Sequence, residues 1–124
     1  MSLHSESVAE WGGFLGGLLD PHGRQMLTYL NALSDASQAG ISDLVVLAFG
    51  SSTTGACRPW SDVDLALVTD YFSGVPWAER IRRLGGRLSP PPLLSPIGLT
   101  HEEYATYTYP AIIRFVREHH VRLL

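Results

Sequence analysis

Two short apolar segments constrain the fold of this 124-residue chain more than any other feature. Residues 44–49 are apolar throughout, and residues 62–69 are apolar on both faces apart from two aspartates near their start. Segments of this length and character are typical of strands buried within a sheet. We therefore expect both segments to be strands of one sheet that is covered by helices.

Helical spacing of apolar residues, together with helix-start signals, predicts the covering helices. They are expected over residues 6–19, 21–40, 76–88 and 110–118, with a short helix that begins at a capping box of Thr100 and Glu103. Four glycines weaken the first helix, and we interpret them as allowing close approach to another helix. Further strands are expected over residues 93–99 and 121–124. The predicted fold class is thus α/β (α+β), a small mixed sheet flanked by helices.

The length and composition are those of one globular domain, and we assign residues 1–124 to it. Residues 1–40 would supply the N-terminal helices, and residues 41–124 the sheet with its motifs. The longest apolar run has six residues, too few to cross a membrane, and the N-terminus lacks the pattern of a secretory signal. A single cysteine, Cys57, excludes an internal disulfide. We therefore expect a cytoplasmic location.

The charge balance limits the classes of ligand. The chain has 9 basic residues, all of them arginine, and 12 acidic residues, for a net charge of −3. This balance argues against nonspecific nucleic-acid binding, so we do not expect nucleic acid as a direct ligand. Arg80, Arg83 and Arg87 have the spacing of one helix face. We interpret that face as solvated, and contact with a triphosphate, RNA or an acidic partner is the alternative.

Asp62 and Asp64 are the first candidates for chemistry. Alternate residues of a strand point to the same face, so the two carboxylates would project together with Cα atoms roughly 6.5–7 Å apart. Two like charges at the start of an apolar strand are costly unless a cation neutralises them. Hard oxygen ligands suit Mg²⁺. The alternative is that both acids lie in solvent and cap turn amides.

Gly50 and Ser51 form the second candidate, because they directly follow a buried strand and begin a polar turn of small residues. Such a turn can direct backbone N–H groups and hydroxyls at phosphate oxygens, although alone it is more simply a plain turn. Ten residues, 52–61, separate it from Asp62. A phosphate-binding turn that faces paired carboxylates is what metal-assisted phosphoryl or nucleotidyl transfer requires.

Residues 49–65, with the sequence Phe-Gly-Ser-Ser-Thr-Thr-Gly-Ala-Cys-Arg-Pro-Trp-Ser-Asp-Val-Asp-Leu, resemble the signature of the nucleotidyltransferase fold shared with DNA polymerase beta. That signature has a hydrophobic residue before Gly-Ser, a spacer of about ten residues and then Asp-x-Asp. The resemblance implies that Gly50 and Ser51 hold the phosphates of a nucleoside triphosphate. It also implies that Asp62 and Asp64 act as catalytic residues by binding one or two Mg²⁺ (or Mn²⁺) ions.

The sequence departs from the family at one position. Family members carry a third acid on a later strand, and that acid helps to deprotonate the acceptor hydroxyl. The corresponding segment, residues 93–99, contains no acid, and Ser95 is the nearest residue to the expected position. We assign the following Glu102 and Glu103 to a helix cap and the surface. The chain by itself is thus expected to bind metal and nucleotide but to transfer NMP slowly or not at all.

The small size resembles that of minimal nucleotidyltransferases, which are often paired with a helical HEPN-type toxin and act as its antitoxin. Some of them transfer AMP from ATP to the toxin. The resemblance therefore implies a Mg²⁺-dependent transfer of NMP from a nucleoside triphosphate to a hydroxyl of a protein partner. ATP is the expected donor. Two alternatives stay open: a non-catalytic nucleotide-binding antitoxin, and a nucleotidyltransferase that acts on RNA or a small molecule. The arginine face and the glycine-rich first helix are the surfaces expected to meet a partner.

Overall fold

A computed structural model of the chain describes residues 5–55 and 58–124, and Cys57 lies outside these ranges. Its α-helices, strands and 3₁₀ helices (η) follow one another in this order: α1 (Ser5–Gly16), α2 (Asp20–Ala39), β1 (Val45–Phe49), η1 (Gly50–Thr53), β2 (Val63–Val68), η2 (Asp70–Phe72), η3 (Trp77–Glu79), α3 (Arg80–Leu84), η4 (Gly86–Leu88), β3 (Leu94–Leu99), α4 (His101–Thr106), α5 (Ala111–Glu118) and β4 (Val121–Arg122). Across these ranges, no helix combines the length and the apolar character needed to span a bilayer.

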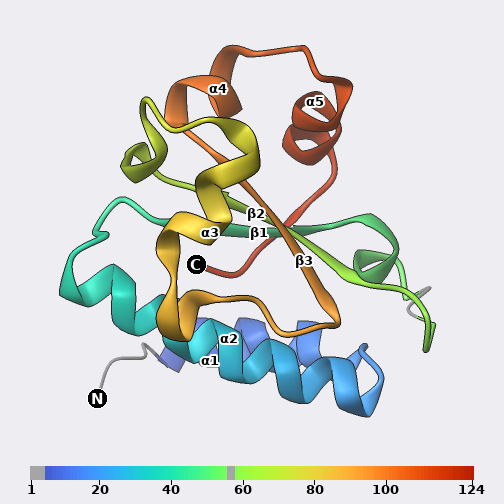
Figure 1. Cartoon of the computed structure of the whole chain (residues 1–124). Helices are drawn as coiled ribbons and strands as arrows, with labels where there is room; N and C mark the ends of the chain where they lie inside the picture. Colours follow the sequence, from blue (N-terminus) through green and yellow to red (C-terminus); the bar gives the residue numbers. More distant parts are fainter. Residues whose placement is uncertain (1–4, 56–57) are drawn as a thin grey trace.

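The four strands form one mixed sheet in the order β3-β2-β1-β4 (Figure 1). β1 pairs antiparallel with β2 and with β4, whereas β2 and β3 are parallel. β4 is shorter than predicted, but the backbone N–H groups of Leu123 and Leu124 still donate to the Val46 carbonyl. The α+β class, with a mixed sheet and helices on its faces, is confirmed.

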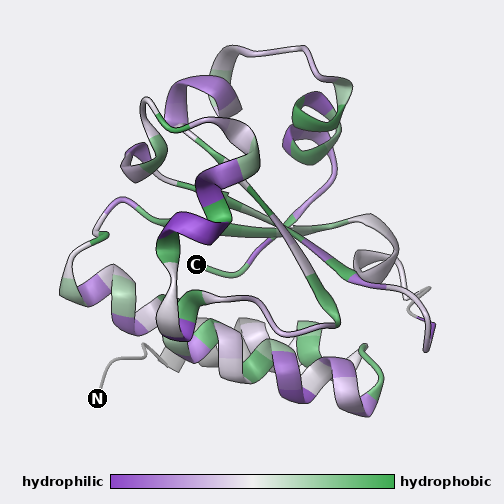
Figure 2. Ribbon diagram, viewed as in Figure 1, coloured by the Kyte–Doolittle hydropathy of each residue, from purple (hydrophilic) through white to green (hydrophobic). Residues whose placement is uncertain are grey.

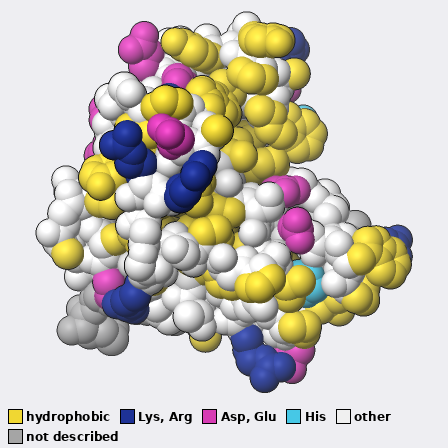
Figure 3. All heavy atoms as spheres, viewed as in Figure 1, with side chains coloured by type: hydrophobic (Ala, Val, Ile, Leu, Met, Phe, Trp, Pro, Cys, Tyr) yellow, Lys and Arg dark blue, Asp and Glu magenta, His cyan; other side chains and the backbone are white. Residues whose placement is uncertain are grey.

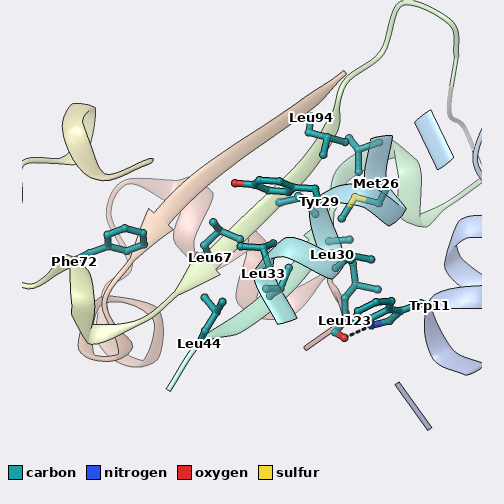
Figure 4. Close-up of a cluster of buried hydrophobic side chains, with 14 residues drawn as sticks. Trp11, Met26, Tyr29, Leu30, Leu33, Leu44, Leu67, Phe72, Leu94 and Leu123 are labelled. Atoms are coloured by element: carbon teal, nitrogen blue, oxygen red, sulfur yellow. Dashed lines mark hydrogen bonds between the residues drawn. The ribbon is translucent and has the colours of Figure 1, made fainter. Parts of the chain in front are cut away.

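Helices α1 and α2 cover one face of the sheet (Figure 1). α2 carries Pro21 in its first turn and ends at Gly40, as the sequence predicts. The main core lies between these helices and the strands. Figure 4 draws its side chains and labels ten of them: Trp11, Met26, Tyr29, Leu30, Leu33, Leu44, Leu67, Phe72, Leu94 and Leu123. The indole N–H of Trp11 donates to the Leu123 carbonyl, so α1 is tied to the C-terminal segment. Figure 2 shows β1 mostly in the colours of hydrophobic residues, whereas hydrophobic and hydrophilic residues alternate along α2.

A smaller core lies on the other face, under α4 and α5. It consists of apolar side chains from three strands and from α5: Leu47, Phe49, Ala66, Val68, Leu99, Ile113 and Val116. The alternation of side chains along β2 puts Asp64 on the same face as Ala66 and Val68. Asp64 is only half-buried, and Asp62, one residue before the strand, is exposed. The acidic start of β2 therefore lies at the margin of this smaller core.

The single helix predicted over residues 76–88 is wrong. The segment is divided into η3, α3 and η4, and the chain turns at Gly85 and Gly86, which have φ values of 60° and 52°. Both values lie in the left-handed region that glycine adopts without a steric penalty and that interrupts an α-helix. The break separates Arg87 from the helical residues before it.

The arginine face expected from Arg80, Arg83 and Arg87 is therefore also wrong. Arg80 is buried, and its guanidinium makes a bidentate ion pair with Glu103 and donates to the carbonyls of Val75 and Gly98. Arg83 and Arg87 are exposed, and Arg87 pairs with Asp35 at 3.4 Å. A buried arginine requires a compensating carboxylate, which here lies 23 residues away in the chain.

Glu103 forms the predicted capping box with Thr100, but it does not lie on the surface as we expected. Its carboxylate accepts the Thr100 N–H at 2.8 Å while it also binds Arg80. Burial raises the pKa of Glu103, but the hydrogen bonds and charge of Arg80, with the Thr100 N–H, outweigh this effect and hold that pKa below its ordinary value. Glu102 is exposed, as expected.

The glycines of the first helix do not bring it close to another helix, so this interpretation is wrong. A Cβ added to Gly12, Gly13 or Gly16 would meet no heavy atom of the described residues within 4 Å. α1 ends at Gly16 and packs through larger side chains such as Trp11 and Phe14. These glycines are therefore exposed and make no close helix–helix contact among the described residues.

Candidate functional site

Gly50 and Asp64 lie in contact at the end of the β1–β2 pair. Phe49, the last residue of β1, is the Cα partner of Asp64 in β2, and Gly50 follows with φ of +80°. A Cβ at Gly50 would stand 2.6 Å from Oδ2 of Asp64. Both the backbone angle and this close approach require glycine. The two motifs predicted from the sequence thus meet at one end of the β1–β2 pair, the two central strands of the sheet.

The turn after Gly50 is stabilised by its own side chains. The hydroxyl of Thr53 donates to the Gly50 carbonyl at 2.8 Å, and the hydroxyl of Thr54 donates to the Ser51 carbonyl at 3.0 Å. The hydroxyl of Ser52, which is buried, donates to the Phe49 carbonyl at 3.4 Å. Within the described ranges the half-buried Ser51 hydroxyl has no hydrogen-bond partner. Ser51 is therefore the hydroxyl of this turn that is available to a ligand.

Asp62 and Asp64 form a negative site without a compensating cation among the residues that the structure describes. Burial and, second, the charge of Asp62 raise the pKa of Asp64. No arginine or histidine in those ranges forms an ion pair with either carboxylate, and no group of three or more His, Cys, Asp or Glu residues there could hold a metal. Two carboxylates fit Mg²⁺ or Mn²⁺ when ligand phosphates and water supply the remaining oxygens.

Ser95 of β3 lies directly opposite Asp64, because the two residues are Cα partners in the β2–β3 register. β3 holds no acid anywhere along its length, so no carboxylate of this strand stands beside Asp64.

Two residues of α2 that the sequence analysis did not identify hold the segments that lead into the site. His22, which is fully buried, lies with Nε2 2.7 Å from the Ser61 carbonyl. Because a carbonyl only accepts, Nε2 carries the proton, and Nδ1 has no partner among the described residues. The Gln25 side chain accepts the Leu93 N–H at 2.9 Å. These contacts join residues far apart in sequence, so no local pattern could have revealed them.

Two ring contacts involve residues close in sequence to the motifs. The ring of Phe49 makes an edge contact with Phe115 of α5, with 6.4 Å between ring centroids. Trp60, two residues before Asp62, is 76% exposed and its ring centroid lies 5.9 Å from the Arg58 guanidinium carbon. Figure 3 shows acidic side chains beside the hydrophobic surface over α5. The sequence analysis identified neither Phe115 nor Trp60.

Comparisons with known proteins found no family model, no curated protein and no solved structure that matches this chain.

Proposed function

We propose that this chain is a metal-dependent minimal nucleotidyltransferase with the nucleotidyltransferase fold. It would transfer the NMP group of a nucleoside triphosphate, ATP being the expected donor, to a hydroxyl of a protein partner. The observation that carries the proposal is the contact between Gly50 and Asp64, because it brings the turn that would bind phosphate against one of the two carboxylates that would bind metal. The resemblance of residues 49–65 to the family signature supports the same assignment.

The residues of the site would have separate tasks. Gly50 lets the turn lie against Asp64 without a side chain in the way, so that a phosphate at the turn would also be close to that carboxylate's metal, and the Ser51 hydroxyl donates to a phosphate oxygen. Asp62 and Asp64 would hold Mg²⁺ or Mn²⁺, and a bound ion neutralises phosphate charge and polarises the α-phosphate. The raised pKa of Asp64 is consistent with this role, since a cation would remove the unfavourable charge that burial and Asp62 create.

The proposed reaction is a displacement at the α-phosphorus. The acceptor hydroxyl oxygen forms a bond to the α-phosphorus, and the bond from that phosphorus to the oxygen bridging to the β-phosphate breaks. Pyrophosphate leaves with the bonding electron pair, and the hydroxyl proton passes to solvent. Because β3 offers Ser95 where the family has a base, we expect slow transfer by the chain alone.

A second molecule would supply the acceptor. The described elements form one sheet with helices on its faces, and none of them is assigned to an acceptor. By the family resemblance, we propose a small helical partner of the HEPN toxin type, with this chain as its antitoxin. A partner that positions its hydroxyl in line with the α-phosphate can contribute several kcal/mol toward the barrier, which would offset the missing base.

Ser95 favours a second candidate, a non-catalytic antitoxin that binds nucleotide without transferring it. To separate the two, the chain is incubated with Mg²⁺ and ATP labelled at the α-phosphate, with and without the protein encoded beside it. Label on the partner, absent with the Asp62→Asn/Asp64→Asn variant, supports the enzyme. Nucleotide binding without any label favours the non-catalytic antitoxin, and rapid labelling by the chain alone contradicts the two-acid argument.

A further inference from the structure

Helix α5 exposes an aromatic ring on the face of the sheet to which Asp64 points. Its buried side chains, Ile113 and Val116, pack on the sheet in the smaller core. Phe115 is nevertheless 44% exposed and Ile112, one turn earlier, 39% exposed, so α5 presents a second apolar surface that faces away from the core. The exposure of this phenylalanine is not explained by the packing of the fold.

One side chain connects Phe115 to the site. Phe49 contacts the Phe115 ring, with 6.4 Å between centroids and 67° between ring planes. Phe49 is also the Cα partner of Asp64 and the residue directly before Gly50. The side chain of Phe49 thus connects Phe115 to the Gly50 turn, where the phosphates of the ligand would bind.

The ring of Phe115 is held in place before any ligand arrives. The ring of His119, one helical turn after Phe115, packs against the Phe115 ring with 5.0 Å between centroids. α5 itself is fixed by Arg117, whose guanidinium donates to the carbonyls of Tyr104 and Tyr107 at 2.8 Å each. A ring that is already ordered loses little conformational freedom when a ligand stacks on it.

We propose that Phe115 is a stacking platform for the base of the nucleotide whose phosphates lie at Gly50 and Ser51. This inference rests on the proposed function and adds to it the site for the base. A planar heteroaromatic base matches an exposed ring better than an aliphatic group does, because stacking on aromatic side chains is favourable for every base. Since a ring face does not read hydrogen-bond donors and acceptors, Phe115 binds ATP and GTP similarly.

The test compares the affinities of Mg²⁺–ATP and Mg²⁺–tripolyphosphate, which lacks a base, by calorimetry. Phe115→Ala should weaken ATP binding by about 5-fold to 150-fold and leave tripolyphosphate binding unchanged. Phe115→Trp should restore ATP binding. Tyr71→Ala is the matched control, because Tyr71 is 55% exposed and makes a similar edge contact with a buried phenylalanine, Phe72, at 6.2 Å, but follows the other end of β2.

Equal ATP affinity of the Phe115→Ala variant and the unmodified chain would overturn the platform, and so would an equal loss for both ligands. The experiment also separates this inference from its premise. If the unmodified chain binds tripolyphosphate as tightly as ATP, the platform is wrong while the phosphate site stands. If it binds neither ligand, the proposed function fails as well.

Discussion

The Cα of Gly50 lies so close to the carboxylate of Asp64 that an added Cβ would stand 2.6 Å from Oδ2. This contact joins the turn after β1 to the acidic start of β2. The turn and the acid therefore cannot move independently, and a change at either one should be felt at the other.

Gly50→Ala should disturb the site beyond its cost in stability. The positive φ alone costs about 1–2 kcal/mol for a residue with a Cβ. Gly74→Ala is the matched control, because Gly74 has φ of +77° and open space around it. Both variants should lose melting temperature in calorimetric unfolding, and Gly50→Ala at least as much as Gly74→Ala, because its Cβ also meets Asp64. Only Gly50→Ala should lose Mg²⁺–ATP affinity, and equal affinity in the two variants would contradict the role of the contact.

Asp64→Asn should stabilise the chain in the absence of metal. The pKa of Asp64 is raised in the folded state, so the folded state binds the proton more tightly than the unfolded state does. The resulting contribution to the free energy of unfolding is present at low pH and is lost as pH rises through the raised pKa. At neutral pH the carboxylate is ionised and its cost is fully present. Asparagine removes this cost, and we expect an increase of a few degrees at most in the melting temperature. The difference in melting temperature between Asp64→Asn and the unmodified chain should shrink as the pH falls toward 3.8, the ordinary pKa of an aspartate. A difference that grows as the pH falls would contradict the prediction.

Ser95→Asp should supply the carboxylate that β3 lacks. Its register with Asp64 would place a third acid beside the existing pair. We expect tighter Mn²⁺ binding, measured by calorimetry, and lower stability without metal because three like charges then share the site. If the chain transfers nucleotide, the rate should rise by about 10²- to 10⁴-fold. Ser95→Asn controls for size, and identical Mn²⁺ affinities in the two variants would rule out Ser95 as the third position.

Arg80→Met should be strongly destabilising, whereas Arg83→Met should not. Removing Arg80 leaves the Glu103 carboxylate buried without its partner, which typically costs about 3–5 kcal/mol. Arg83 is exposed, so its loss should change the free energy of unfolding by about 0.5 kcal/mol or less. Denaturant unfolding measures both, and equal effects would contradict the burial of the ion pair.

The same ion pair predicts a dependence on pH. The pKa of Glu103 is lowered in the folded state, so its contribution to stability is present above the ordinary value of 4.5 and is lost as pH falls through the lowered pKa. The unmodified chain should lose this contribution in acid. The Arg80→Met variant should show a flatter acid limb of the stability curve, and parallel acid limbs would contradict the assignment.

The local parts of the fold could be predicted from the sequence. Residues 44–49, 62–69 and 93–99 are each predicted as strands; β1 and β3 begin one residue later than predicted, and β2 is one residue shorter at each end. The boundaries were readable because polar turns and prolines interrupt the apolar runs at those points. The capping box of Thr100 and Glu103 is also predictable, because its two residues lie three positions apart in the sequence.

The environment of Arg80 could not be predicted in this way. Its spacing to Arg83 indicated a solvated face, but its burial depends on Glu103 and on Gly98, which lie far along the chain. A Cβ at Gly98 would stand 3.0 Å from the Arg80 Cβ and 2.8 Å from the Phe72 ring. Long-range packing of this kind has no signature in helical spacing.

For the candidate site, sequence spacing gave the residues but not their contacts. Gly50, Ser51, Asp62 and Asp64 follow from the motif, and the β1–β2 register adds the contact between the turn and the acid. His22 shows what remained hidden, because its bond to the Ser61 carbonyl spans 39 residues. The ring of Phe115 was equally hidden, since apolar spacing on α5 does not tell which apolar side chains stay exposed.

Calorimetric titration of Mg²⁺–ATP tests the central claim, that Asp62 and Asp64 bind a metal–nucleotide complex, most directly. The titration compares the unmodified chain with Asp62→Asn/Asp64→Asn, and with Asp20→Asn as a control at an exposed acid of α2. We predict saturable, Mg²⁺-dependent binding by the unmodified chain and the Asp20→Asn variant, and none by the double variant. Equal binding by all three proteins in the presence of Mg²⁺ would contradict the assignment of these carboxylates.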